Sequence, residues 1–402
     1  MDPVSNPSSA SRKRVLSGMR PTGKLHLGNY MGALHNWVRL QDQYECYFFI
    51  ADWHALTTDY ADPSQIPANT REVILDYLAA GLDPEKSVLF VQSHVPQHAE
   101  LHLLLSMITS VGWLERVPSY KEQQENLKDR DLSTYGFLGY PLLQAADILL
   151  YQPDFVPVGQ DQVAHVELTR EIARRFNFLY PRDPEVKRAP MEGITREDIR
   201  AQGLEERFLA EHPNADPTAG HNYRKGISAE RLWSKESITL PEPQALLTPS
   251  PKLPGTDGRK MSKSYGNTIL LSDPEPEIRA KLKPMVTDPA RVRRKDPGNP
   301  DKCPVGDLHK IFSSQETLAK VYDGCTTAAI GCIECKTWVA DAIVAHLAPI
   351  QERRAHFEQK PALVTEILAA GDERALNRAE QTMQEVRAAM GLAESTQGVV
   401  AQ

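Results

Sequence analysis

The sequence has few cysteines, no excess of positive charge and no long hydrophobic run. Its five cysteines among 402 residues are too few and too unevenly placed for the disulfide framework of a small secreted domain. No apolar stretch approaches the roughly 20 residues of a membrane-spanning helix. The first residues, MDPVSNPSSASR, lack the apolar core of a signal peptide. We therefore expect a disordered tail over residues 1–12 and a cytoplasmic protein with no membrane partner.

The formal charge of −7 at pH 7 argues against indiscriminate binding to nucleic acid. It does not exclude an RNA partner, because RNA binding needs a local basic face rather than a basic total. The other proportions, 25% charged and 41% hydrophobic residues, are ordinary for a globular enzyme. The length is sufficient for two domains and a large core.

The stretch Ser17–Tyr30, SGMRPTGKLHLGNY, combines three glycines with an apolar residue pair just before it. Apolar residues then recur at helical spacing at Leu27, Met31, Leu34 and Val38. This pattern predicts a strand, a glycine-rich turn and a helix whose free N–H groups can bind phosphate. Taken alone it is equally typical of an ordinary strand-to-helix turn, because it matches neither GxGxxG nor GxxxxGK[ST].

A second stretch, Lys260–Ser264, has the sequence KMSKS and follows the turn-forming Pro254–Gly258. Two lysines in a short hydroxyl-rich loop suit a mobile clamp on a polyphosphate, where they neutralise charge that develops on a leaving group. Many surface loops contain lysine and serine, so composition alone predicts little. The full string, found together with LHLGN far upstream, is much more specific.

Between residues 14 and 178, segments typical of buried strands alternate with segments of helical spacing. The predicted strands are Cys46–Ala51 and Val88–Gln92, and the predicted helices are Arg71–Ala80 and His98–Val111. This alternation predicts an α/β fold with a doubly wound, Rossmann-like parallel sheet. Ligands bind such sheets at the carboxyl ends of the strands. We therefore expect three segments near one crevice: Arg20–Asn29, His54 and Pro157–Gln162.

The second half of the chain differs from the first. Residues 182–253 hold many prolines and charges, and we expect an insertion on the outside of the fold, where it could contact RNA or a partner. Within it, Thr195–Asp198 (TRED) resembles a helix start of the capping-box kind, with Asp in place of Glu. Strand patterns stop near Leu271. Two later segments fit single helix faces, around Ala375–Met390 and at Val339, Ile343, Leu347 and Ile350. We therefore expect a sheet domain over residues 13–270 and an all-helical domain over residues 271–402.

The HLGN of residues 26–29 and the KMSKS of residues 260–264 resemble the two signature motifs of class I aminoacyl-tRNA synthetases. Four further strings resemble the bacterial type of tryptophanyl-tRNA synthetase: SGMRPTG, VQSHVP, YPLLQAADILLY and PVGQDQVAHVELTREIARRFN. The resemblance covers about residues 14–391. It implies that ATP, with Mg²⁺, activates L-tryptophan to tryptophanyl-adenylate, and that the tryptophanyl group then passes to the 3′ end of tRNA(Trp). It also implies a homodimer and an anticodon-binding helical domain.

No covalent enzyme intermediate is implied, so catalysis would rest on positioning and charge stabilisation. The residues that the resemblance implies for ATP binding are Arg20, Pro21, Thr22, Gly28, Asn29, Gly159, Gln160, Asp161, Lys260, Met261, Ser262, Lys263 and Ser264. The implied catalytic residues are His26, Asn29, Lys260, Lys263 and Ser264. Arg20 stands where many relatives carry Gln, and His26 where some tryptophan enzymes use Thr. Asp161 is suited to accept hydrogen bonds from ribose hydroxyls.

Tryptophan differs from the other aromatic amino acids by its indole N–H, for which a buried carboxylate is the strongest acceptor. Asp147, in QAADILL, matches the family's indole-binding residue, and its apolar surroundings make a partner necessary. A carboxylate satisfied by nearby backbone is the alternative. A site of this kind rejects phenylalanine, so no editing domain is expected. The resemblance adds further pocket residues: His54, Tyr140, Gln144 (where some relatives have Met), Val156, Val158 and Gln162.

Four of the five cysteines follow the pattern C-x21-C-x6-C-x2-C, and they are Cys303, Cys325, Cys332 and Cys335. Four thiolates could hold zinc or an iron–sulfur cluster, and buried free cysteines are a further alternative. The context GCIECK resembles a subset of tryptophanyl-tRNA synthetases with a 4Fe–4S cluster in the anticodon-binding domain, which favours the cluster over Zn²⁺. The fifth cysteine, Cys46, is predicted to lie in the core.

A basic run, Arg291, Arg293, Arg294 and Lys295, precedes the cysteines and is predicted either to meet tRNA phosphates or to be a solvated loop. Three rival functions share parts of the pattern. A tyrosine-specific sister enzyme has the same fold, but the QAADILL and PVGQDQ contexts disfavour it. A non-catalytic tRNA-binding or iron–sulfur sensing paralogue would have a broken HLGN or KMSKS. A small-molecule adenylyl ligase would not need the helical domain.

Overall fold

A computed structural model describes residues 12–118, 132–182, 238–247 and 253–392. Nearly all of the predicted N-terminal tail, and the TRED helix start at residues 195–198 in the predicted insertion, lie outside these ranges. No helix within the described ranges has the length and apolar character needed to cross a membrane.

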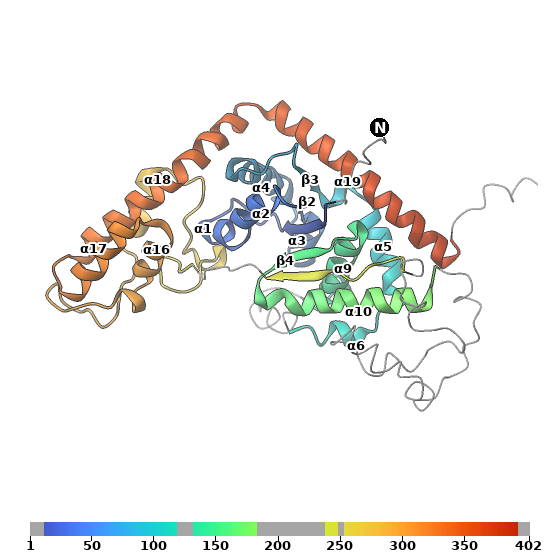
Figure 1. Cartoon of the computed structure of the whole chain (residues 1–402), viewed down its shortest axis with the longest axis horizontal. Helices are drawn as coiled ribbons and strands as arrows, with labels where there is room; N and C mark the ends of the chain where they lie inside the picture. The colour runs from blue at the N-terminus through green and yellow to red at the C-terminus, as the bar shows by residue number, and fades with distance from the viewer. Residues whose placement is uncertain (1–11, 119–131, 183–237, 248–252, 393–402) are drawn as a thin grey trace, which may run out of the picture.

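The centre of the molecule is a parallel five-stranded sheet with the order β3-β2-β1-β4-β5, which confirms the predicted α/β class (Figure 1). The strands are β1 Arg14–Met19, β2 Glu45–Ile50, β3 Ser87–Val91, β4 Phe155–Val158 and β5 Gln244–Leu247. β1 lies between β2 and β4, so the direction of winding reverses there, and the crevice that binds ligands in such folds opens at this point.

Strand β5 was not predicted. It lies within the range expected to be an insertion, yet it pairs with β4 along its whole length, from Phe155 opposite Gln244 to Val158 opposite Leu247. Its four residues, QALL, are too few to show the alternation of a strand, and two of them are exposed, as an edge position allows. At least this part of the range belongs to the sheet.

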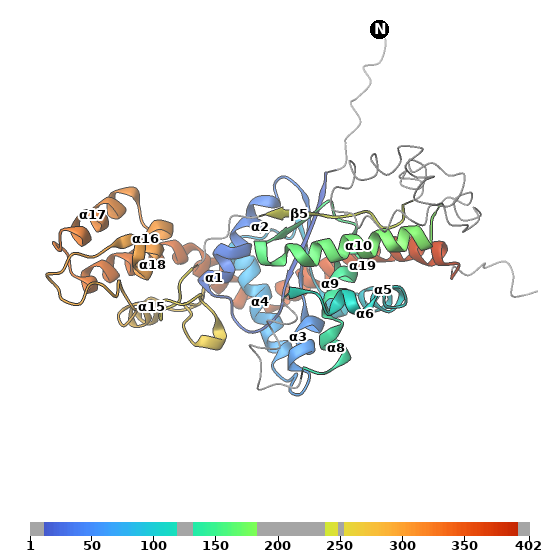
Figure 2. The same ribbon diagram turned by 90° about the horizontal axis from the view of Figure 1, so that it is seen from below.

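Alternate strand residues face opposite layers, as strand geometry requires. Val15, Phe48 and Leu89 belong to one core cluster, and Leu16, Phe49 and Phe90 to the other. Helices pack against both faces of the sheet (Figure 2). These helices are α1 Leu27–Asn29, α2 His35–Leu40, α3 Asp52–Asp59, α4 Ile66–Ala80, α5 Gln97–Ser106, α6 Val111–Leu114, α8 Tyr135–Leu138, α9 Tyr140–Tyr151 and α10 Val163–Leu179.

Two helix predictions differ from the structure in instructive ways. The single helix predicted over His98–Val111 is wrong, because α5 ends at Ser106 and Ser110 has an extended backbone before α6. The helix predicted from Leu27 to Val38 is present, but its middle turn, Tyr30–Leu34, is π-helical. Such turns insert an extra residue and are frequent at functional sites.

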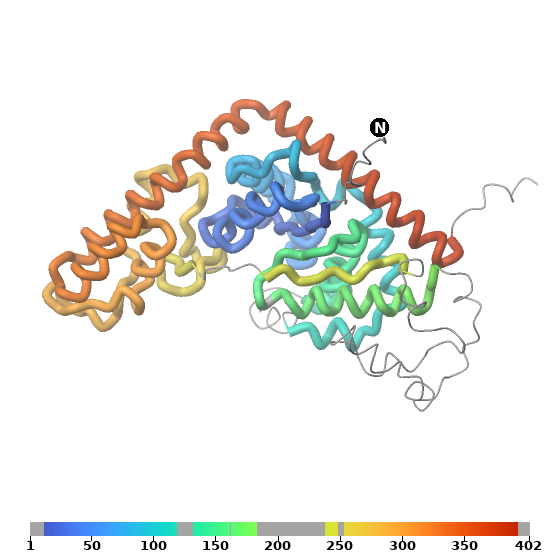
Figure 3. The backbone as a smooth tube through the Cα atoms, in the orientation of Figure 1, coloured from blue at the N-terminus to red at the C-terminus, as the bar shows by residue number. Residues whose placement is uncertain are grey.

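The C-terminal region is helical, as predicted, and comprises α15 Glu275–Leu282, α16 Pro304–Phe312, α17 Gln315–Thr326, α18 Cys332–Glu358 and α19 Pro361–Met390. The predicted face of α18 is buried. Figure 3 shows α19, in red, returning from the distal helices across the sheet. At Gly371, α19 approaches β3 so closely that a Cβ atom on this residue would lie 1.8 Å from the Leu89 carbonyl oxygen. The helical region is therefore anchored on β3.

Candidate active site

The turn after β1 ends in a reciprocal cap that starts the signature helix. The Asn29 N–H donates to His26 Nδ1 (3.3 Å), and the His26 N–H donates to Asn29 Oδ1 (3.2 Å). Burial, aided by the nearby Lys263 ammonium, lowers the pKa of His26 to about 4. His26 is therefore neutral at pH 7 and can accept this hydrogen bond. Glycine is required at position 28, because a Cβ atom there would lie 2.9 Å from the His26 ring.

The KMSKS loop lies directly on this turn, although 240 residues separate them. Lys263 Nζ donates to the Gly23 carbonyl (2.8 Å) and lies 3.4 Å from Thr22 Oγ1. A short backbone pairing accompanies this contact, with Leu271 N–H donating to the Leu25 carbonyl (3.0 Å). Gly23 has a φ of +107°, which favours glycine. The two motifs predicted to share a site are therefore in contact.

Lys263, where the KMSKS loop meets the turn after β1, has a lowered pKa. Burial lowers its pKa to about 8. Among the described residues it forms no ion pair, and its hydrogen-bond acceptors are neutral oxygens. A half-buried ammonium with only neutral partners favours the approach of an anion. The neighbouring Ser262 and Ser264 hydroxyls are 2.9 Å apart, while Lys260 and Arg20 are exposed.

The remaining predicted ATP contacts follow β4, at the same edge of the sheet. Gly159 precedes a 3₁₀ turn over Gln160–Gln162, which leads into α10. The backbone of Asp161 lies in this turn, and its side chain is outside the described part of the chain. Pro21 and Met261 are buried. The predicted residues are therefore placed on the carboxyl-end loops of β1 and β4, and on the loop that covers the first of them.

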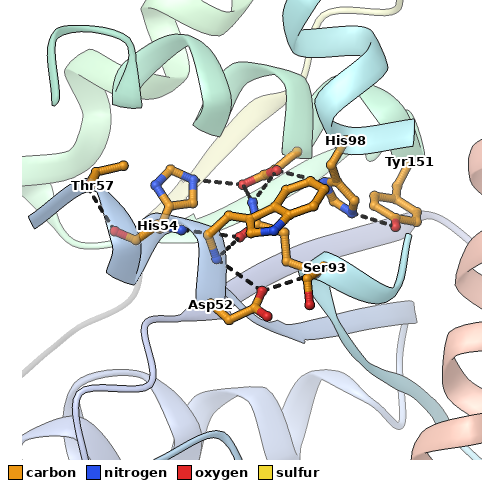
Figure 4. Close-up of polar contacts among 9 residues, drawn as sticks. Asp52, His54, Thr57, Ser93, His98 and Tyr151 are labelled. Carbon is orange, nitrogen blue, oxygen red and sulfur yellow. Dashed lines mark hydrogen bonds and ion pairs between the residues drawn. The ribbon is translucent and has the colours of Figure 1, made fainter. Parts of the chain in front are cut away.

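Asp147 lies at the centre of a buried polar network, and Figure 4 labels three of its members, His54, His98 and Tyr151. Its side chain is 1% exposed and accepts hydrogen bonds from His54 Nε2 (2.8 Å), His98 Nδ1 (2.7 Å) and Gln92 Nε2 (2.8 and 3.0 Å). Burial raises the pKa of this carboxyl, but His98 and His54 outweigh it and lower the pKa to about 2. Asp147 is therefore an anion whose hydrogen bonds come from side chains. The alternative of a carboxylate satisfied by nearby backbone is wrong.

This network gathers residues from four elements. His54 is on α3 just after β2, Gln92 directly follows β3, His98 is on α5, and Asp147 and Tyr151 are on α9. Tyr151 lies 2.9 Å from His98 Nε2. Sequence reasoning missed Gln92, His98 and Tyr151 as site residues. The available signal was Gln92, a polar residue directly after a wholly buried strand and within the string VQSHVP, whereas His98 lies two residues beyond that string.

The other predicted pocket residues lie on neighbouring elements. Tyr140, Gln144 and Asp147 follow one another at helical spacing along α9, so they share a face of that helix. Tyr140 is buried, with its ring 5.7 Å from that of His165. Val156 is buried in β4, whereas Gln144, Val158 and Gln162 are half-buried.

The four C-terminal cysteines converge although they come from three segments. Cys303 precedes α16, Cys325 is near the end of α17, and α18 begins at Cys332 and includes Cys335. All four line one cavity of about 20 Å³. Burial raises the pKa of Cys335 to about 12. No group of three or more His, Cys, Asp or Glu residues in the described chain is arranged as a metal site. Cys46 is buried in β2, as predicted.

Arg291 lines the same cavity and is only 9% exposed. Its Nη1 lies 3.7 Å from Cys325 Sγ, and its Nη2 donates to the carbonyls of Ile330 (2.7 Å) and Arg294 (3.0 Å). Arg294 donates to the carbonyls of Ala328 and Ala329. Both expectations for the basic run are therefore wrong at Arg291, which is neither solvated nor free to meet RNA. Arg293 and Lys295 are exposed.

Comparisons with known proteins agree with this geometry. The sequence model of the family "tRNA synthetases class I (W and Y)" matches residues 8–196 and 222–348. The tryptophan–tRNA ligase of Ralstonia nicotianae is 50% identical over 397 residues, covering 95% of this chain and 99% of the relative. That of Thermotoga maritima is 49% identical over 381 residues, covering 94% and 99%.

Among solved structures, the tryptophanyl-tRNA synthetase of Campylobacter jejuni, in complex with ADP and tryptophan, superposes with a TM-score of 0.71. It is 29% identical, and the match covers 94% of this chain and all of that one. The similarity thus extends over the sheet and the helical region together.

Proposed function

The chain belongs to the class I tRNA synthetases for tryptophan and tyrosine, and from this premise we propose how its site works. It ligates tryptophan to tRNA, using ATP. In the first step a carboxylate oxygen of L-tryptophan attacks the α-phosphorus of ATP, and the bond to pyrophosphate breaks. In the second step a ribose hydroxyl at the 3′ end of tRNA(Trp) attacks the activated carbonyl, and AMP leaves.

The ATP site that we propose lies between the turn after β1, the KMSKS loop and the turn after β4. Lys263 carries the argument, because it is a half-buried cation whose partners among the described residues are neutral oxygens. The β- and γ-phosphates, which arrive with Mg²⁺ as part of the substrate, would replace those partners. Lys263 and Lys260 then stabilise charge on the departing pyrophosphate. Gly28 and Asn29 offer the helix N-terminus to phosphate.

We propose the remaining contacts as the sequence predicted them. Arg20, Pro21 and Thr22 would line the phosphates from the first turn, with His26 beside them. Met261, Ser262 and Ser264 would complete the clamp. The turn of Gly159, Gln160 and Asp161 would hold the adenosine.

For the amino acid we propose that Asp147 accepts the indole N–H. The supporting observation is that this carboxylate is ionised, buried and confined by three side chains. An acceptor of this kind discriminates strongly against rings that lack the donor. His54, Tyr140, Gln144, Val156, Val158 and Gln162 would form the walls.

Amino-acid-dependent pyrophosphate exchange tests this assignment. The wild-type protein should exchange with tryptophan, and only weakly with tyrosine or phenylalanine. Exchange with tyrosine at a comparable rate would identify the tyrosine-specific sister activity and refute the role of Asp147.

We propose that the four cysteines hold a 4Fe–4S cluster, with Zn²⁺ as the alternative. The chemistry of the donor set supports this proposal, because four thiols line one cavity beside a buried guanidinium, although the described residues are not arranged as a metal site. Arg291 forms no ion pair among the described residues, although the buried Asp288 lines the same cavity, and four thiolates on a metal centre would add a net negative charge beside the guanidinium. Protein purified without oxygen should contain about four iron atoms per chain. Colourless protein with one zinc and no iron would select Zn²⁺.

The helical region from residue 271 is proposed as the anticodon-binding domain, with residues 13–270 as the catalytic domain. The cluster would stabilise that distal end without redox turnover. Residues 183–237 of the predicted insertion lie outside the described chain, so their contact with RNA or a partner stays a prediction. So does the cytoplasmic location.

A homodimer is proposed on the basis of an exposed apolar stripe. Leu103 on α5, Met107 directly after this helix, and Val111 at the start of α6 are 55%, 67% and 56% exposed. They are spaced four residues apart, and exposed apolar patches of this kind mark interfaces between subunits. Light scattering should give twice the chain mass of 45.0 kDa. Met107→Lys should shift it towards the monomer, while the exposed-site control Glu115→Lys should not.

A further inference from the structure

The acceptor positions of Asp147 are divided between a closed side and an open side. A carboxylate offers about four acceptor positions on its two oxygens. His98 and Gln92 bind Oδ1 at 2.7 and 2.8 Å, and His54 and the longer Gln92 contact reach Oδ2 at 2.8 and 3.0 Å. The His98 side chain is 0% exposed, whereas that of His54 is 11% exposed. An arriving N–H therefore reaches Oδ2, while His98 stays on Oδ1.

Hydrogen bonds on both sides of the His98 ring hold it in place. An ionised carboxylate only accepts, so His98 Nδ1 must be the donor to Asp147. The Tyr151 hydroxyl is 2.9 Å from Nε2, and burial raises the pKa of Tyr151, so the phenol keeps its proton. A continuous hydrogen-bonded chain therefore connects Tyr151, His98 and Asp147.

The His98 ring cannot easily leave this position. Three aromatic rings surround it, with centroid distances of 6.0 Å to Phe49, 6.1 Å to Phe90 and 5.4 Å to Tyr151. Figure 4 shows His54 and His98 reaching the network from opposite sides, with Tyr151 beyond His98. The enclosed member of the pair thus has a fixed orientation.

We propose that His98 and Tyr151 are positioning residues for the choice of amino acid: Tyr151 holds the His98 ring through its Nε2 atom, and His98 orients the Asp147 carboxylate so that Oδ2 faces the indole N–H. Neither residue touches the substrate. The inference rests on the proposed role of Asp147. It adds the cause of the orientation of Asp147, namely its contact with His98 and the contact of His98 with Tyr151, both deeper in the core.

The test compares two substrates that differ only in the donor. Pyrophosphate exchange is measured with tryptophan and with the analogue in which a sulfur atom replaces the indole N–H. Four variants are compared: Tyr151→Phe, which removes the hydroxyl; His98→Phe, which removes both bonds; His98→Asn, whose amide N–H restores the bond to Asp147; and Tyr47→Phe as control. Tyr47 is a buried tyrosine whose ring lies 5.2 Å from that of Tyr151, but its hydroxyl contacts Glu45.

The wild-type protein should prefer tryptophan by roughly 100-fold or more. His98→Phe should lower kcat/KM for tryptophan by roughly 10- to 100-fold, because it removes one hydrogen bond to a charged group. The value for the analogue should change by less than about twofold. Tyr151→Phe should reduce the preference about threefold to tenfold. His98→Asn should recover most of the loss, and Tyr47→Phe should keep the wild-type preference.

Two failures remain distinguishable. If the wild-type protein does not discriminate between the substrates, the indole-binding role of Asp147 is refuted. If it discriminates, but His98→Phe and Tyr151→Phe lower kcat/KM for both substrates by the same factor, the two residues are merely structural and the present inference is overturned. Thermal unfolding of each variant identifies a fold defect, and in that case the ratio of the two substrates in the remaining folded fraction still decides.

Discussion

The molecule buries charge in two contrasting ways. Asp147 is an anion enclosed by three side-chain donors, so its charge is compensated by hydrogen bonds within the protein. Arg291 and Lys263 are cations whose partners in the described chain are carbonyl oxygens, one hydroxyl and one thiol. The charge of Asp147 is compensated by side-chain donors before any ligand arrives. The charges of the two cations are not compensated by an ion pair in the described chain, and each cation lies where our proposals place an anionic group.

The difference separates selection from binding. A carboxylate held by three donors is rigid, and it gains only from a ligand that offers a further donor in the correct direction. A cation with neutral partners exchanges them for any suitable anion, and it gains more free energy the more negative that anion is. The first arrangement suits recognition of one side chain, and the second suits a triphosphate or a negatively charged metal centre.

The largest expected effect is that of a substitution at Asp147. Asp147→Asn should lower kcat/KM for tryptophan about 1,000-fold, because an amide cannot accept the indole N–H and three donors at once. Pyrophosphate exchange at varied tryptophan measures it. The KM for ATP should stay within about twofold. An unchanged preference for tryptophan over tyrosine would contradict the assignment.

The next effect concerns the cation beside the signature turn. Lys263→Ala should lower kcat about 100-fold, because the developing charge on pyrophosphate loses its stabilising partner. The matched control is Lys24→Ala. Lys24 is an exposed lysine of the same turn, and its Nζ forms an ion pair with Glu72 Oε2 at 3.8 Å. Single-turnover adenylate formation measures both. Equal losses in the two variants would show only a general effect of surface charge.

Arg291→Met tests whether the second cation needs an anion. In protein that holds a metal centre, the variant should lower the free energy of unfolding by about 2 kcal/mol and lose iron faster. In metal-free protein the sign should reverse or vanish, because an uncompensated buried charge has been removed. Chemical denaturation before and after chelation measures both. Arg294→Met, which removes an exposed arginine of the same run, should show no reversal.

The smallest effect is a pH dependence. The pKa of Lys263 in the free protein is lowered to about 8, so the ammonium loses its proton as the pH rises above that value. We expect kcat/KM for ATP to fall by up to about tenfold per pH unit above pH 8. Lys263→Arg, which stays charged, should remove this fall. A wild-type profile that stays flat to pH 10 would contradict the assignment.

The sequence was sufficient where the determinants are local. β2 and β3 are continuous apolar runs, and HLGN and KMSKS are contiguous strings, so these features could be predicted. The partners of Asp147 could not, because Gln92, His98 and Tyr151 meet only when α5 packs against α9 at the end of β3. The burial of Arg291 depends in the same way on how the loop before Cys303 folds against α17. β5 was missed because four residues carry too little pattern.

The return of α19 across the sheet has a consequence for the amino-acid site. Asp372 on this helix accepts the N–H of Val91 at 3.0 Å, and Val91 immediately precedes Gln92, which binds Asp147. The strand end beside the proposed amino-acid site is therefore held by a helix that lies far along the chain. Shortening the chain within this helix would do more than trim an appendage, because it would loosen one wall of the specificity pocket.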